Sequence, residues 1–118
     1  MISLETASQS APPIDGIFRA LADPTRRRVV ERLNRSPASV SELAEPFEMA
    51  LPSFIEHLKL LEGCGLVQSE KAGRVRTYRL SPEPLKVAED WLAEQRALWE
   101  RRLDRFDAYV MSLKETEK

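Results

Sequence analysis

The chain has 118 residues, the size of one compact domain with little room for a second. Hydrophobic residues make up 42% of the chain and charged residues 31%, and no apolar run approaches the roughly 20 residues that cross a bilayer. The single cysteine, Cys64, excludes an internal disulfide and a cysteine-rich zinc module. The first residues, MISLE, contain no basic residue and are not followed by an apolar segment. We therefore expect a cytoplasmic protein without a secretory signal.

The formal net charge is −1, but the charges are unevenly distributed. From Leu51 to Leu80 there are five basic and three acidic residues, whereas from Ser81 to Lys118 there are seven basic and nine acidic residues. A basic surface is therefore expected only in the middle of the chain, and the C-terminal segment is acidic.

The N-terminal third predicts an arm followed by two helices. Residues 1–13 are rich in Ser, Ala and Pro and have no periodicity, which indicates a flexible arm. From Ile14 apolar residues recur at helical spacing, and Asp23-Pro24 separates this helix from a second one that ends near Arg35. Asp23 is suited to cap the second helix, and Pro24 to occupy its first position.

The next segment predicts a helix-turn-helix. After a loop at residues 36–39, Ser41 is expected to cap a short third helix that includes Phe47. A fourth helix is expected from Leu51 to about Gly63, because a proline lies in its first turn and glycines follow it. Two short amphipathic helices joined by a tight turn make up this motif.

A hairpin and a long helix complete the chain. Short β-prone runs from Leu66 to Leu80 surround Gly73, which predicts a β-hairpin with a basic tip. A last helix can extend from about Pro84 to Leu113, and apolar residues recur along it every seven positions, as in a coiled coil. About 30 residues span roughly 45 Å, more than so small a domain can cover, so we expect a homodimer. The predicted interface residues are Leu92, Trp99, Leu103, Phe106 and Val110.

The predicted fold is mainly α with a small β-hairpin, in the order of a winged helix-turn-helix. Several motifs resemble the ArsR/SmtB family of bacterial transcriptional regulators. These motifs are IFRALADPTRRR at 17–28, SVSELA at 39–44, LPS at 51–53, HLK at 57–59, GLV at 65–67 and GRVRTY at 73–78. The resemblance covers about residues 14–80, which would form the DNA-binding domain, and leaves residues 81–118 as a dimerisation helix. It implies a dimeric repressor that releases a pseudo-palindromic operator when an effector binds.

The fourth helix carries the residues expected to face the major groove. Helical geometry directs Pro52, Glu56 and Lys59 away from the apolar side, with Ser53 and Ile55 at the edges of the outward side. The resemblance puts the DNA-facing positions of the family on Pro52, Ser53, Ile55 and Glu56. Many relatives have Ser-Lys where this chain has Ile55-Glu56, and a carboxylate repels phosphate although it can accept from cytosine. Pairing of Glu56 with a nearby lysine is an equally good interpretation.

The hairpin tip carries the residues expected to contact phosphates. These are Lys71, Arg74 and Arg76, because a protruding basic wing can lie against the DNA backbone. The arginines at 26–28 fit either phosphate contact or burial of their stems beside acidic neighbours. Tyr78 is expected to anchor the hairpin to the domain.

No metal site or catalytic site is predicted. A thiolate site would need cysteines where the chain has Ser39 and Ser41, and no histidine follows Ser81. His57 is expected to form a structural hydrogen bond, and Cys64 to be a packing residue. The chain has no glycine-rich phosphate loop, so neither an enzyme nor a cofactor is expected.

The sequence thus predicts a sequence-specific DNA-binding repressor of a subgroup that does not sense metals. Two alternatives remain open. A winged-helix module that binds other proteins and has lost operator binding would explain Ile55 and Glu56. Trp91 and Trp99 could line a pocket for an unknown effector instead of lying in the dimer core.

Overall fold

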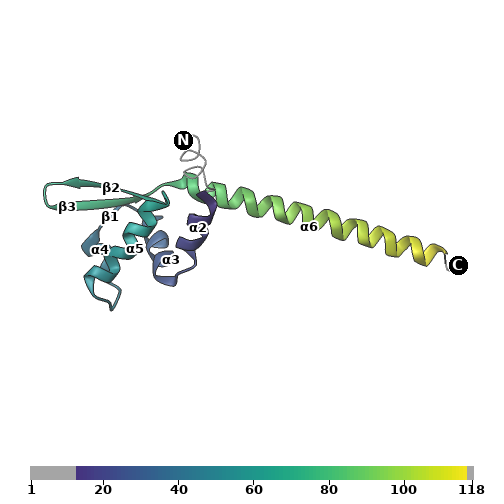
Figure 1. The fold of residues 1–118 in the computed structure, drawn as a ribbon, viewed down its shortest axis with the longest axis horizontal. Coiled ribbons are helices and arrows are strands. Elements are labelled where there is room, and N and C mark those ends of the chain that lie inside the picture. Colours follow the sequence, from purple (N-terminus) through teal and green to yellow (C-terminus); the bar gives the residue numbers. More distant parts are fainter. Residues whose placement is uncertain (1–12, 117–118) are drawn as a thin grey trace, which may run out of the picture. The chain divides into compact units, whose positions relative to one another are not determined.

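The computed structural model describes residues 13–116 (Figure 1). The predicted N-terminal arm lies outside the described residues except for its last residue, Pro13, which begins a helix. Contacts divide the chain into two units, Met1–Ala88 and Glu89–Lys118, which we describe separately. Within residues 13–116 no helix is both long enough and apolar enough to cross a membrane.

The first unit contains helices and a small antiparallel sheet, which confirms the predicted fold class. The elements are α2 (Pro13–Leu21), α3 (Pro24–Leu33), β1 (Ala38–Ser39), α4 (Val40–Ala44), α5 (Leu51–Gly63), β2 (Val67–Ala72), β3 (Val75–Leu80) and the start of α6 (Pro82–Thr116). In Figure 1 the tip of the β2–β3 hairpin extends beyond helices α4 and α5.

Helix α3 begins as the sequence predicts. Asp23 has an extended backbone (φ −104°, ψ 131°), and its carboxylate accepts from the backbone N–H of Arg26 at 3.0 Å. Pro24 follows in the first turn, where its missing N–H costs no hydrogen bond. This hydrogen bond is also the main reason why the pKa of Asp23 lies below its ordinary value of 3.8.

Helix α4 begins two residues earlier than predicted. Its cap is Ser39, not Ser41: the Ser39 hydroxyl accepts from the backbone N–H of Glu42 at 3.3 Å. The Glu42 carboxylate in turn accepts from the backbone N–H of Ser39 at 2.9 Å. This reciprocal arrangement requires Glu or Gln three residues after the cap, which Ser39 has and Ser41 lacks. The helix ends at Ala44, so Phe47 lies in the following turn.

The sheet has one strand more than predicted. Strands β2 and β3 form the expected hairpin, and β1 pairs with the other edge of β3 to give the order β1-β3-β2. Ala38 lies opposite Tyr78, and Ser39 opposite Thr77, in a segment that we predicted to be a loop. Two residues are too short to show the alternation by which a strand is recognised. Gly73 takes the positive φ of +64° that the hairpin turn requires.

The core lies between the helices and one face of the sheet. Helix α5 contributes Phe54, Leu58 and Leu61, all with an exposed fraction of 0%. The other fully buried large side chains are Ile17, Val29, Leu43, Leu66 and Val67. Burial of large aliphatic and aromatic side chains contributes roughly 1.5–3 kcal/mol each, so this cluster fixes the orientation of α5.

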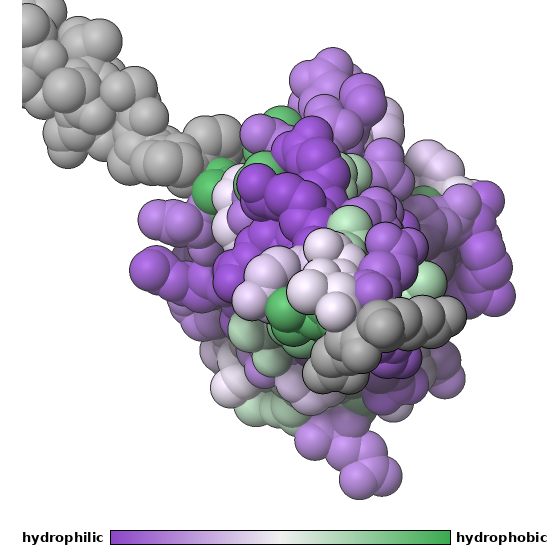
Figure 2. Space-filling view, turned by 90° about the vertical axis from the view of Figure 1, so that its right-hand side faces the viewer, coloured by the Kyte–Doolittle hydropathy of each residue, from purple (hydrophilic) through white to green (hydrophobic). Residues whose placement is uncertain are grey.

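The second unit consists of the remainder of α6, which extends beyond the predicted 84–113 at both ends. In the single chain, four of the predicted interface residues, Leu92, Trp99, Leu103 and Phe106, are exposed, and Val110 is half-buried. Figure 2 views the molecule from the C-terminal side and shows small groups of hydrophobic residues on a mostly hydrophilic surface. The apolar positions along α6 are thus available to a partner chain.

Candidate nucleic-acid interface

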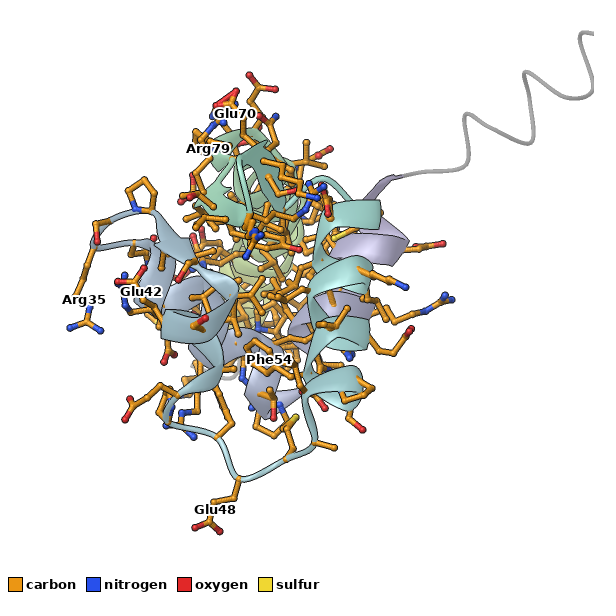
Figure 3. All side chains as sticks on the ribbon, turned by 90° about the vertical axis from the view of Figure 1, so that its left-hand side faces the viewer. Arg35, Glu42, Glu48, Phe54, Glu70 and Arg79 are labelled. Atoms are coloured by element: carbon orange, nitrogen blue, oxygen red, sulfur yellow. The ribbon has the colours of Figure 1, made fainter. Side chains whose placement is uncertain are left out.

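Helix α5 presents the predicted groove-facing residues on its outward side. Pro52, Ser53, Glu56 and Lys59 are exposed, and Ile55 is half-buried. Figure 3 shows Phe54 on the opposite, inward side among the side chains of the core. The buried face and the exposed face of α5 therefore agree with those that helical spacing predicts.

Glu56 and Lys59 form an exposed ion pair on this outward side. The Lys59 Nζ lies 3.7 Å from the Glu56 Oε1, and the side chains are 67% and 73% exposed, respectively. Pairs of this kind contribute at most about 1 kcal/mol, so this pair neutralises Lys59 locally but adds little to the stability of α5. The predicted pairing of Glu56 with a neighbouring lysine is confirmed, while contact of Glu56 with a base stays a prediction.

Arg26 connects three helices at the N-terminal half of α5. Its guanidinium donates to the carbonyl of Ala20 at 2.8 Å and to that of Arg19 at 3.0 Å, both near the end of α2. It also lies 3.0 Å from the Nδ1 of His57 in α5. Because a guanidinium has no acceptor, His57 Nδ1 must be the acceptor in this bond. The structural hydrogen bond predicted for His57 is confirmed. The Oδ2 of Asp23 also lies near the same nitrogen, at 3.8 Å.

The other two arginines of the run have separate structural partners. Arg27 donates to the carbonyl of Leu21 at 2.7 Å, and the Arg28 guanidinium lies 4.5 Å from the centre of the Phe47 ring. Phe47 contacts Phe54 in turn, with 5.3 Å between ring centres. The run thus organises helix ends and the turn before α5. Sequence reasoning offered this as one of two possibilities but did not find the link from Arg26 to His57.

A shallow hollow lies beside the first turns of α5. Its volume is about 580 Å³, and it is open to solvent along the outward side of the helix. It is lined by Arg26, Ser53, Glu56, His57, Lys59 and Leu60. The hollow brings three of the predicted groove-facing residues, Ser53, Glu56 and Lys59, next to Arg26 and His57. The sequence alone did not indicate that these two groups are neighbours.

The hairpin carries three exposed cations near its tip: Lys71, Arg74 and Arg76. Among residues 13–116, the side chains of Lys71 and Arg74 have no hydrogen-bond or ion-pair partner. Arg76 differs, because its guanidinium donates to the Ser69 hydroxyl at 2.8 Å. Figure 3 shows the neighbouring hairpin residues Glu70 and Arg79 at the edge of the molecule, away from Phe54.

Tyr78 anchors the hairpin, as predicted. Its side chain is only 5% exposed, and the residue pairs with both Ala38 and Ser69 across the sheet. Burial is the main cause that raises the pKa of the Tyr78 hydroxyl, and the negative charge of Glu62 acts in the same direction. The hairpin base is therefore fixed in the core, whereas its tip is exposed.

The described residues offer little for metal binding. Within residues 13–116 no three His, Cys, Asp or Glu side chains are grouped so that they could hold an ion. Ser39 is occupied as a helix cap, and the Cys64 thiol donates to the carbonyl of Leu61 at 3.4 Å. The packing role predicted for Cys64 agrees with this contact, and the absence of a metal site stays a prediction.

The profile of the bacterial regulatory protein family arsR matches residues 23–69. A solved ArsR family transcriptional regulator is 58% identical, with a TM-score of 0.73 over 75% of this chain and 91% of that chain. The chain belongs to the ArsR family. Family membership makes it a transcriptional regulator with a winged helix-turn-helix, a class distinct from enzymes.

Two curated relatives show the extent of the similarity. The HTH-type transcriptional regulator Rv2034 of Mycobacterium tuberculosis is 44% identical over 71 residues, which are 60% of this chain and 66% of that protein. The transcriptional repressor SdpR of Bacillus subtilis is 27% identical over 79 residues, which are 67% of this chain and 88% of that protein. This chain therefore spans slightly less than two thirds of the length of Rv2034.

Proposed function

We propose that this ArsR family regulator is a homodimeric repressor that binds a pseudo-palindromic operator through α5 and the hairpin tip. The observation that carries the proposal is the exposed outward side of α5 beside a hairpin with two free cations. A major groove accepts one helix, and an adjacent basic wing supplies phosphate contacts that add affinity. Repression is supported by the similarity to SdpR, whose name is that of a transcriptional repressor. A repressor of bacterial operators would act in the cytoplasm.

The residues divide into base-facing and phosphate-facing groups. Ser53 and Ile55 offer a hydroxyl and an apolar group that suit a base edge and a thymine methyl. Lys71 and Arg74 offer exposed charges without side-chain partners among the described residues, which suits phosphate. Contacts of the first kind decide which sequence is bound, and contacts of the second kind decide how strongly binding depends on salt.

Dimerisation would give the two-fold symmetry that such an operator requires. Exposed Leu92, Trp99, Leu103 and Phe106, with Val110, supply an apolar stripe for a second copy of α6. Two chains related by a two-fold axis would present two copies of α5 to successive major grooves.

The test is a titration of fluorescent DNA from the protein's own upstream region at several salt concentrations. Arg74→Ala is expected to weaken binding to all sequences and to reduce the salt slope by about one per site. Arg35→Ala is the matched control, because Arg35 is another exposed arginine, and it points outward from a different part of the domain (Figure 3). Equal effects of the two substitutions would contradict the role of the wing.

A second candidate function is a winged-helix module that binds other proteins. Glu56 favours this second function, because its carboxylate places a negative charge on the side of α5 that would enter the groove and neutralises Lys59 there. A folded dimer that fails to bind its upstream DNA even at low salt would favour this second function over the first.

A further inference from the structure

A chain of polar side chains joins the end of α5 to the hairpin. The Ser69 hydroxyl in β2 donates to the Glu62 carboxylate in the last turn of α5 at 2.8 Å. The same Ser69 oxygen accepts from the Arg76 guanidinium in β3, also at 2.8 Å. Three elements are thus connected through one hydroxyl, which uses both its donor and an acceptor position.

The charges of Glu62 and Arg76 lie close enough to act on one neighbouring group. Both influence the pKa of the Tyr78 hydroxyl, which Glu62 raises and Arg76 lowers. Tyr78 lies opposite Ser69 in the sheet, so all four side chains surround the same point. The negative charge of Glu62 therefore offsets part of the positive field that Arg76 would offer to DNA.

Arg76 is in this respect unlike the other cations of the hairpin tip. The side chains of Lys71 and Arg74 have no hydrogen-bond or ion-pair partner among the residues that the structure describes. A guanidinium that leaves Ser69 for a phosphate would give up a hydrogen bond between elements, whereas Lys71 and Arg74 would give up none. Sequence reasoning treated the three residues alike because all are basic and all lie near the same turn.

We infer that Arg76 is a positioning residue that fixes the hairpin relative to α5 through Ser69 and Glu62, while Lys71 and Arg74 make the phosphate contacts. This inference rests on the proposed binding of an operator. Its physical basis is that α5 and the wing must meet adjacent parts of one duplex, so a shift between them weakens both sets of contacts.

The opposite face of the hairpin provides a matched control. There Arg79 donates to the side-chain oxygen of Gln68 at 2.6 Å, again from β3 to β2. That pair also joins an arginine to a neutral acceptor and crosses the same two strands, but no bond of the described residues continues from it to α5. Removal of Gln68 should therefore disturb the hairpin locally and leave its orientation to α5 unchanged.

The experiment compares Ser69→Ala, Arg76→Ala and Gln68→Ala in operator titrations at several salt concentrations. Ser69→Ala removes no charge and is expected to weaken binding about three- to tenfold without a change in the salt slope. Arg76→Ala should weaken binding at least as much with the same unchanged slope, and Gln68→Ala should have no effect. A slope reduced by about two in Arg76→Ala, one for each chain of the dimer, would make Arg76 a phosphate contact and overturn the inference, as would wild-type affinity in Ser69→Ala.

Amide hydrogen exchange tests the inference without DNA. Ser69→Ala is expected to accelerate exchange in the hairpin from Lys71 to Val75 more than Gln68→Ala does, because only the first substitution releases the hairpin from α5. Equal exchange in both variants would overturn the inference even if the operator binds. A wild-type protein that binds no operator but shows the expected exchange would refute the proposed function and leave the positioning role of the polar chain standing.

Discussion

Substitution of Arg26 should destabilise the first unit more than any other change in the arginine run. Arg26→Ala removes three hydrogen bonds from a charged donor, to Ala20, Arg19 and His57. Bonds to charged groups contribute about 1.5–3 kcal/mol each, and the bond to Arg19 is exposed and counts for less. Two part-buried bonds at the lower end of this range give an expected loss of about 3 kcal/mol. A domain has only about 5–15 kcal/mol in total, so the loss is large.

The measurement is urea unfolding followed by far-ultraviolet circular dichroism. Wild type and variant must be compared at one chain concentration, because dimerisation would make stability depend on concentration. Arg27→Ala is the control: it removes the same charge but only one exposed bond, to Leu21, and should cost less than about 1 kcal/mol. If Arg26→Ala costs no more than Arg27→Ala, the three-helix contact contributes nothing beyond a solvated charge.

Two further substitutions test the cap and the dimer. Because the pKa of Asp23 is held below 3.8, mainly by the backbone N–H of Arg26, its carboxylate stabilises the fold at neutral pH, and this contribution disappears as the pH falls through the lowered value. Asp23→Asn keeps an acceptor oxygen but loses the charge, so the variant should be less stable than wild type at pH 7. In urea titrations this difference in stability should shrink towards pH 2, and a constant difference would contradict the reasoning. Trp99→Glu should yield monomers in sedimentation, since it buries a charge in the predicted seam, whereas Ala97→Glu, about 160° away on the helix, should not.

Local signals in the sequence were sufficient to predict the helices that carry the site. Asp23 acts through a bond to Arg26, three positions away, and Pro24 acts through its own ring and missing N–H. Their effect on the start of α3 is therefore visible in the sequence. The bounds of α5 followed in the same way from the proline in its first turn and the glycine at its end. The direction of its buried face followed from helical spacing.

Contacts between distant residues decided what the sequence did not show. Ser39 caps α4 and also pairs with Thr77, so strand and cap occupy one residue. Arg26 and His57 are 31 positions apart, and nothing in either neighbourhood marks them as partners. Arg76 was grouped with Lys71 because both are basic, although only the fold brings Ser69 next to it.

These contacts limit how many cations are free for DNA, and that limit predicts the salt dependence of binding. Helix α5 is tied at its middle by the bond of His57 to Arg26 and at its end by the chain through Ser69 to Arg76, so neither arginine is available without loss of an internal bond. Lys59 is paired with Glu56. Lys71 and Arg74 remain without a side-chain partner among the described residues, which gives four contacts in a dimer. At a slope of about 0.9 per phosphate, the logarithm of affinity should fall with the logarithm of salt concentration with a slope of roughly −4.

A slope of about −7 would mean that Arg26 and Arg76 also reach phosphates, at the expense of the bonds that position α5. A slope near −2 would mean that only one cation of each chain is engaged. Titration of the wild-type protein with its upstream DNA between 50 and 200 mM salt, on the order of the range where such slopes are linear, distinguishes the three values. The same data set the baseline against which the loss of about two units in dimeric Arg74→Ala, one from each chain, and of none in Arg76→Ala, is measured.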